Sequence, residues 1–145
     1  MKIREMTVSD INAVLPFYIS YYNEQENGCW TEERAAKRIH QVLSMEDSLS
    51  LIAENEDGAF GFAMGYFKQY DDITGYTLEE IVIAYEYQNQ GFGSVLLGEL
   101  ERAVQEKGAA CVELHAVSDE QHERFYGKAA YHNAKNFVVK VKWFG

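Results

Sequence analysis

Residues Thr77–Gly98 read T-L-E-E-I-V-I-A-Y-E-Y-Q-N-Q-G-F-G-S-V-L-L-G. The first part, Thr77–Tyr85, is rich in β-branched and apolar residues and predicts a largely buried strand. A turn containing Gly91 and Gly93 follows, and an apolar helical pattern begins at Ser94. Two glycines beside a helix N-terminus let a ligand approach amide groups that have no partner inside the helix. Because the positive end of the helix dipole lies there too, the pattern predicts a phosphate or pyrophosphate site.

Two common phosphate-binding motifs do not fit this turn. The dinucleotide fingerprint needs a third glycine where Leu96 stands, and a Walker loop needs a Gly-Lys-Ser/Thr triplet that the chain lacks. The spacing Gln88-x-x-Gly91-x-Gly93 after an apolar strand instead resembles the acetyl-CoA loop of the GNAT superfamily of N-acetyltransferases. The alternative is an ordinary strand-to-helix turn. The resemblance implies that the pyrophosphate is held by Gln88, Asn89, Gln90, Gly91, Phe92, Gly93 and Ser94.

Composition limits the other classes of function. The chain has 145 residues and a net charge of −10, which favours cationic small molecules or basic peptides over nucleic acid or an anionic membrane. Cys29 and Cys111 have no metal-ligand spacing, so we expect no metal and a reducing compartment. Without a signal core or a membrane-length apolar run, a cytoplasmic protein is expected.

Hydrophobic periodicity predicts the order β-α-α-β-β-β-α-β-α-β. We expect a single mixed α/β domain over residues 1–145, with helices on both faces of a mostly antiparallel, twisted sheet of about six to seven strands. This order resembles the GNAT fold along nearly the whole chain. The expected strands are 2–6, 48–54, 59–66, 77–85, 110–116 and 137–144; the expected helices are 11–22, kinked or ended at Pro16, then 32–43, 91–107 and 119–128.

The segment S-D-E-Q-H-E-R-F-Y-G-K-A-A-Y, residues 118–131, also looks like a GNAT segment. Its Tyr126 matches a family tyrosine, which implies that its hydroxyl protonates or hydrogen-bonds the leaving thiolate; a packing role is the alternative. Asp119 stands where the family has an asparagine that helps to hold the cofactor arm, and it also suits a helix N-cap. Ala129-Ala130-Tyr131 replaces the family's Leu-Gly-Phe.

Acetyl transfer also needs a group that takes a proton from the amine. Strict alternation puts Glu79 on the face of Ile81 and Ile83, and Glu80 on the opposite face. The resemblance implies that the strand splays from its neighbour near residues 81–84, where the backbone of Ile81 and Ile83 pairs with pantetheine. It favours Glu79 as the base, with Glu80 second, and a bulge would swap their roles. Either residue could instead be solvated or ion-paired.

The acceptor site is expected on the first two helices and in the loop before residue 77, where aromatic and acidic side chains suit a cationic amine. Its candidates are Tyr22, Trp30, Tyr70 and Asp71. The leading interpretation is an acetyl-CoA-dependent N-acetyltransferase that acts on a primary amine of a small molecule by direct transfer. A protein N-terminus or lysine as acceptor, and a non-catalytic CoA-binding module, are the alternatives. The final strand, if it lies at the edge of the sheet, could pair with a second copy of the chain, so a homodimer is an alternative to a monomer.

Overall fold

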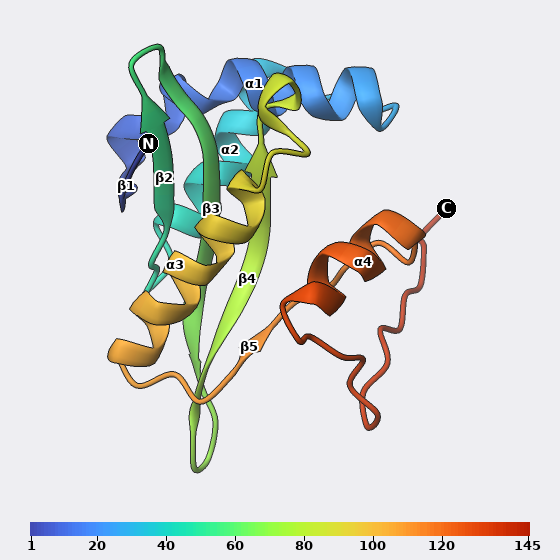
Figure 1. Cartoon of the computed structure of the whole chain (residues 1–145). Helices are drawn as coiled ribbons and strands as arrows, with labels where there is room; N and C mark the ends of the chain where they lie inside the picture. Colours follow the sequence, from blue (N-terminus) through green and yellow to red (C-terminus); the bar gives the residue numbers. More distant parts are fainter. The chain divides into compact units, whose positions relative to one another are not determined.

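The computed structural model describes all 145 residues. They form two compact units, Met1–His115 and Ala116–Gly145, and each is described by itself. The first unit contains the sheet and three α-helices, and the second contains one α-helix (Figure 1). The prediction of one domain over residues 1–145 stays a prediction.

The sheet of the first unit has five strands in the order β1-β2-β3-β4-β5. The first three pairings are antiparallel, and β5 lies parallel to β4. A mixed, mostly antiparallel sheet is confirmed, but six to seven strands are not found. The strands are β1 (Lys2–Glu5), β2 (Leu51–Asn55), β3 (Gly58–Gln69), β4 (Thr74–Ile83) and β5 (Val112–Glu113).

A tight turn joins β2 to β3, between two strands that the sequence predicts. Strand β2 ends at Asn55 and β3 begins at Gly58, which has a φ of 114°. The Asn55 side chain accepts a hydrogen bond of 2.8 Å from the backbone N–H of Asp57. Asn-x-x-Gly therefore fixes the hairpin locally, since the asparagine closes the turn and the glycine adopts the positive φ.

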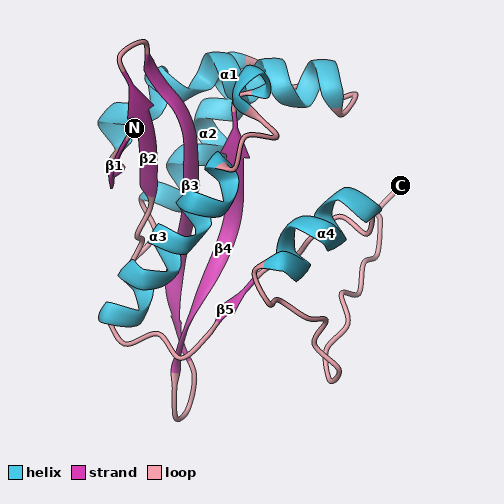
Figure 2. Cartoon of the chain, viewed as in Figure 1, coloured by secondary structure: helices cyan, strands magenta, loops and turns pink.

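Helices cover both faces of this sheet (Figure 2). Helices α1 (Ile11–Gln25) and α2 (Glu32–Leu43) lie on one face, and α3 (Phe92–Glu106) lies on the other. Short 3₁₀ turns precede α1 (η1, Val8–Asp10) and α3 (η2, Tyr85–Tyr87). The core beneath α1 and α2 is built from their buried faces and from the strands: Met6, Ile11, Val14, Leu15, Tyr18, Ala35, Ile39, Val42, Ile52, Phe62, Met64 and Val82.

Helix α1 continues through Pro16, so the expected end there is wrong. Pro16 lacks the N–H that would bond to the carbonyl of Asn12. Both residues are exposed, so water can satisfy that carbonyl.

Arg4 ties β1 to its neighbours in the first unit. Its guanidinium donates to Asp10 Oδ1 at 2.8 Å and to Glu54 Oε1 at 2.8 Å. Asp10 Oδ2 also accepts from the backbone N–H of Thr7 at 2.9 Å, as part of a capping box. The Arg4 hydrogen bonds, with that of Thr7, hold the pKa of Asp10 below its usual value.

A β-bulge interrupts the pairing of β3 with β4. Met64 pairs with Glu80 and the next residue, Gly65, pairs with Leu78, so Glu79 has no partner on β3. Gly65 has no room for a side chain, because a Cβ there would lie 2.1 Å from the Thr77 carbonyl oxygen.

On its other edge, β4 pairs with β5 only at Tyr76 and Thr77, opposite Val112 and Glu113. The expected strand 110–116 is therefore a two-residue strand. From Leu78 to Ile83 this edge of β4 has no partner strand, so the splay predicted near residues 81–84 begins earlier.

The second unit contains helix α4 (Glu120–Lys128), as predicted. The strand predicted over Phe137–Phe144 is wrong, because this segment has no regular secondary structure. A strand needs a neighbour for its backbone hydrogen bonds, and this unit contains no other strand. The large apolar residues of the segment are 63–91% exposed.

Candidate active site on strand β4

The bulge corrects the predicted faces of β4. Met64 and Gly65 are neighbours on β3 and face opposite sides, so their partners Glu80 and Leu78 also face opposite sides. Strict alternation had placed Leu78 and Glu80 together. Since Met64 belongs to the core under α1 and α2, Glu80 faces these helices.

The carboxylate of Glu80 accepts three hydrogen bonds. Tyr22 donates to Oε1 at 2.8 Å, while Tyr18 at 2.9 Å and Arg38 Nε at 3.1 Å donate to Oε2. The Glu80 side chain is only 13% exposed. Both oxygens are therefore engaged with protein donors, as a nearly buried carboxylate requires.

The two tyrosines come from one face of α1, because they are four residues apart. Their rings meet edge to face with centroids 4.8 Å apart, and the Trp30 ring lies 5.4 Å from that of Tyr18. Burial and the negative charge of Glu80 raise the pKa of Tyr18 and of Tyr22 far above the usual value. Both phenols therefore remain protonated donors at neutral pH.

Arg38 is the member of this site that the sequence reasoning missed. It lies three residues after Ala35 and four before Val42, both buried, and so on the face of α2 that meets the sheet. A charged residue at such a position needs a buried partner, which was the available signal. Its Nη1 also lies 3.7 Å from Glu79 Oε1. The bulge thus brings both carboxylates to one cation, instead of leaving them on opposite faces.

The unpaired edge of β4 includes Ile81 and Ile83. The carbonyl oxygen of Ile83 accepts a hydrogen bond of 2.9 Å from the Gln88 side chain. Gln88 therefore links the strand end to the glycine turn, and its amide is engaged within the protein.

In the glycine turn, residues 88–93, Asn89 and Gly91 adopt positive φ values of 62° and 86°. Gly91 is the N-cap of α3, and no side chain caps this helix end. A Cβ on Gly91 would meet nothing within 4 Å. In contrast, Thr31 caps α2 with its side chain. The first amides of α3, at Phe92, Gly93 and Ser94, therefore lack a side-chain acceptor and suit an anion.

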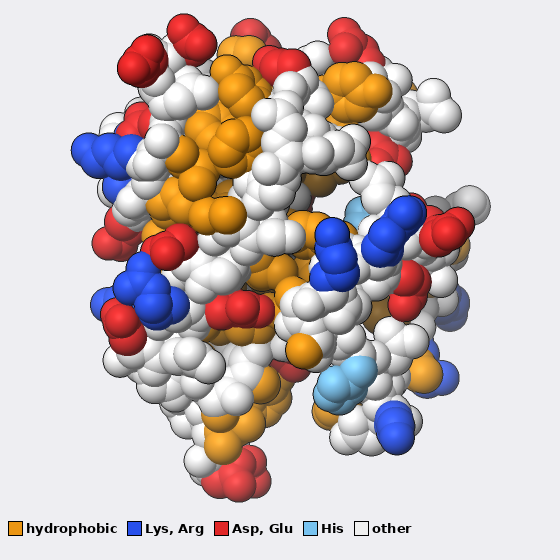
Figure 3. Space-filling view, viewed as in Figure 1, with side chains coloured by type: hydrophobic (Ala, Val, Ile, Leu, Met, Phe, Trp, Pro, Cys, Tyr) orange, Lys and Arg blue, Asp and Glu red, His pale blue; other side chains and the backbone are white.

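Two other side chains of this turn, those of Gln90 and Phe92, contact protein groups nearby. The Gln90 side chain donates to the Glu86 carbonyl at 3.1 Å. The Phe92 ring lies 5.1 Å from that of Phe60 and 6.1 Å from that of Tyr87. Figure 3 shows hydrophobic side chains gathered over the upper ends of β2 and β3 and the start of α3.

The structure divides the predicted acceptor residues into two groups. Tyr22 and Trp30 join the Glu80 site. The Tyr70 hydroxyl instead donates to Glu113 on β5, and the Lys68 ammonium lies 5.5 Å from the centroid of its ring. Asp71 is exposed in the turn between β3 and β4.

Tyr126 and Asp119 lie in the second unit. Burial raises the pKa of the Tyr126 phenol, whose ring meets Phe125 at 4.9 Å and Tyr131 at 5.6 Å. Asp119 is the N-cap of α4 and accepts from the backbone N–H of His122 at 2.8 Å. Its N-cap role is therefore observed, and a role toward a cofactor stays a prediction.

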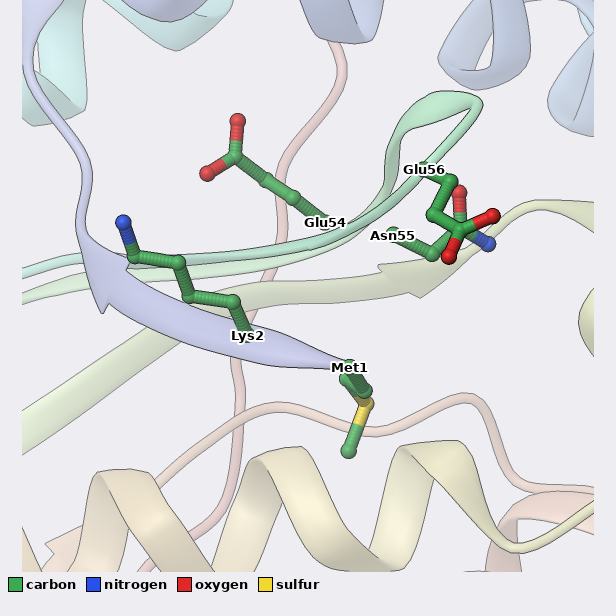
Figure 4. A pocket seen from close by; sticks show the side chains of 5 residues that line it. All are labelled: Met1, Lys2, Glu54, Asn55 and Glu56. Atoms are coloured by element: carbon green, nitrogen blue, oxygen red, sulfur yellow. The ribbon is translucent and has the colours of Figure 1, made fainter.

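A separate hollow of about 450 Å³ lies at the end of β1, between Met1, Lys2 and residues Glu54, Asn55 and Glu56 (Figure 4). It is wide open to solvent and shares no residue with the Glu80 site. No cluster of three or more His, Cys, Asp or Glu residues is arranged to hold a metal ion. None of the helices has the length and apolar character needed to cross a membrane.

The sequence was compared with models of protein families and with curated proteins. The family model described as Acetyltransferase (GNAT) family matches residues 13–131. No curated protein matches the sequence.

Solved structures share the fold at low identity. A probable acetyltransferase has a TM-score of 0.81 and 18% identity, covering 100% of this chain and 99% of its own. A ribosomal-protein-alanine N-acetyltransferase from Brucella melitensis biovar Abortus 2308 has a TM-score of 0.77 and 14% identity, covering 99% and 100%. An aminoglycoside acetyltransferase from an uncultured soil metagenomic sample, in complex with sisomicin, has a TM-score of 0.71 and 16% identity, covering 99% and 95%.

Proposed function

Because this chain belongs to the GNAT acetyltransferase family, we propose that it transfers the acetyl group of acetyl-CoA to a primary amine of a small molecule. The observation that carries the proposal lies on β4. Between Leu78 and Ile83 the strand has a free edge, and the two carboxylates of Glu79 and Glu80 lie on the same stretch. An edge that offers backbone donors and acceptors suits an extended amide-containing arm.

The residues of the glycine turn fit the phosphates of acetyl-CoA. The uncapped N-terminus of α3 offers amide donors, and Gly91 leaves open space beside them. Gln88 to Ser94 would hold the pyrophosphate, and the backbone of Ile81 and Ile83 would align the arm. Bound acetyl-CoA supplies the activated acetyl group.

Although a bulge is present, it does not make Glu80 the base, and Glu79 is the better candidate. Glu80 already accepts three hydrogen bonds, whereas Glu79 has only the 3.7 Å ion pair with Arg38 and is about one-third exposed. After giving one proton to Glu79, the amine nitrogen attacks the thioester carbonyl carbon, so that a C–N bond forms and the C–S bond breaks. As the C–S bond breaks, the leaving thiolate takes a proton from a general acid, and the second proton of the nitrogen restores that acid, so that CoA leaves as the thiol.

Tyr126 is proposed as the donor of that proton. The assignment comes from its match to the family motif, and its raised pKa keeps the phenol protonated at neutral pH. Asp119 remains a secondary candidate for contact with the cofactor arm.

The acceptor is proposed to be a small amine because Tyr22 and Trp30 line the Glu80 site with aromatic surface. One protein of similar structure is named an aminoglycoside acetyltransferase, and another is named a ribosomal-protein-alanine N-acetyltransferase. Acetylation of a protein N-terminus or lysine therefore remains the second candidate. A cytoplasmic location and a homodimer stay expectations.

The test combines binding and turnover. Acetyl-CoA should raise the melting temperature of the wild type, and Gly91→Asp should abolish the shift by placing a carboxylate at the anion site. Thiol release with a panel of amines should fall strongly in Glu79→Gln and in Tyr126→Phe, while Glu46→Gln, an exposed control, should match the wild type. Binding without thiol release for any amine would contradict catalysis and leave a CoA-binding module. No thermal shift at millimolar acetyl-CoA would contradict both functions.

A further inference from the structure

The carboxylate site has a closed inner half and an open outer half. In the inner half, three donors saturate Glu80, which is 13% exposed. In the outer half, Arg38 Nη1 and Glu79 Oε1 are 3.7 Å apart, which is too long for a hydrogen bond. Both side chains there are 32% exposed. The outer half is therefore an ion pair that is not closed by hydrogen bonds and that solvent can reach.

Arg38 has Nη N–H groups in this outer half that make no hydrogen bond to Glu79. Its Nε donates to Glu80 at 3.1 Å and the guanidinium also interacts with the Tyr18 hydroxyl, whereas Nη1 lies 3.7 Å from Glu79 without a hydrogen bond to it. A planar guanidinium binds a carboxylate with two parallel hydrogen bonds. Since Glu80 fixes the Nε side, the remaining side of the guanidinium is held in place and presented beside Glu79.

A purely cationic acceptor fits this arrangement poorly. An ammonium group brought to Glu79 would also approach the positive charge of Arg38, and like charges at this distance repel. An acceptor that carries an anion next to its amine avoids the conflict, because its two charges meet opposite charges on Arg38 and Glu79. The amine and carboxylate of an amino acid are joined through a single carbon, which matches a cation and an anion that lie side by side.

We propose that the acceptor is an amino acid or a similar amine with an adjacent carboxylate, bound with its carboxylate on Arg38 and its amine at Glu79. This inference rests on the proposed function for its chemistry, but the binding geometry can be tested separately. Arg38 is then the residue that determines acceptor specificity.

The experiment compares the common amino acids with their C-terminal amides, which keep the amine and the side chain but lose the negative charge. Binding to the protein saturated with CoA is measured by calorimetry, and transfer is measured with acetyl-CoA. We expect at least one amino acid to bind about tenfold or more tightly than its amide, the range for hydrogen bonds to charged groups. Arg38→Gln should bring this ratio near one. Lys37→Gln, the exposed neighbour on α2, should preserve it.

Amides that bind as well as the acids, no binding of any amino acid, or an unchanged ratio in Arg38→Gln would each overturn the inference. If Arg38→Gln fails to fold, Arg38→Lys decides, since it keeps the charge but loses the two-pronged contact and should lower the ratio. Transfer to amines without preference for the acid would overturn this inference and leave the proposed function standing. Selective binding of an amino acid without acetyl transfer would overturn the proposed function and leave the inferred binding mode at Arg38 and Glu79 standing.

Discussion

Replacing Tyr22 by phenylalanine should destabilise the fold more than the same change at Tyr18. Tyr22 supplies the one hydrogen bond to Glu80 Oε1, whereas Oε2 keeps Arg38 when Tyr18 is changed. A hydrogen bond to a charged group contributes about 1.5–3 kcal/mol. Because Glu80 is 13% exposed, water can reach it in part, and we expect a loss of about 1.5 kcal/mol for Tyr22→Phe. For Tyr18→Phe we expect about 1 kcal/mol.

Tyr21→Phe is the matched control, because it removes the same hydroxyl from the adjacent residue. The Tyr21 hydroxyl donates at 2.9 Å to Glu26, an exposed residue, so we expect a change below about 0.5 kcal/mol. Urea unfolding of the three variants should shift the midpoint at constant m-value. If Tyr22→Phe loses no more stability than Tyr21→Phe, Glu80 does not depend on its buried donors and this reasoning is refuted.

Two further predictions concern the glycine turn and the Arg4 network. Gly91→Ala should lower the free energy of unfolding by about 1–2 kcal/mol, because the φ of this residue is 86°. Gly98→Ala, at an exposed position within α3, should raise it by about 0.5–1 kcal/mol. Thermal unfolding of both variants checks the contrast. The pKa of Asp10 is lower in the folded protein than in the unfolded chain. The ionised carboxylate therefore stabilises the fold fully above the unfolded pKa of about 3.9, and this contribution is lost as the pH falls through the folded pKa. Asp10→Asn should therefore show a smaller loss of stability than the wild type between about pH 5 and pH 2, and equal losses would contradict this assignment.

Local signals made much of the fold predictable. The hairpin was marked by Asn55 and Gly58, and α2 by the Thr31 cap and an apolar stripe. The glycine turn was marked by Gly91, which adopts a positive φ of 86° in the structure.

The failures came from interactions between distant segments. The bulge at Glu79 is coupled to a close backbone approach at Gly65, and no short motif in the sequence announces that pair. Phe137–Phe144 has the pattern of a strand, but pattern alone does not supply a neighbouring strand. No local pattern links Arg38 to the site, because its partners, Glu79 and Glu80, are about forty residues away along the chain.

The free stretch of β4 gives a strand inside the sheet an unpaired edge like that of an edge strand. Amide protons that point toward this edge lack a partner strand, so they should exchange with solvent faster than those bonded to β3. A ligand arm lying along Leu78–Ile83 would slow their exchange and would act as an additional strand. The sheet would then be complete only in the bound protein, and resistance to proteolysis would rise with the ligand concentration around it.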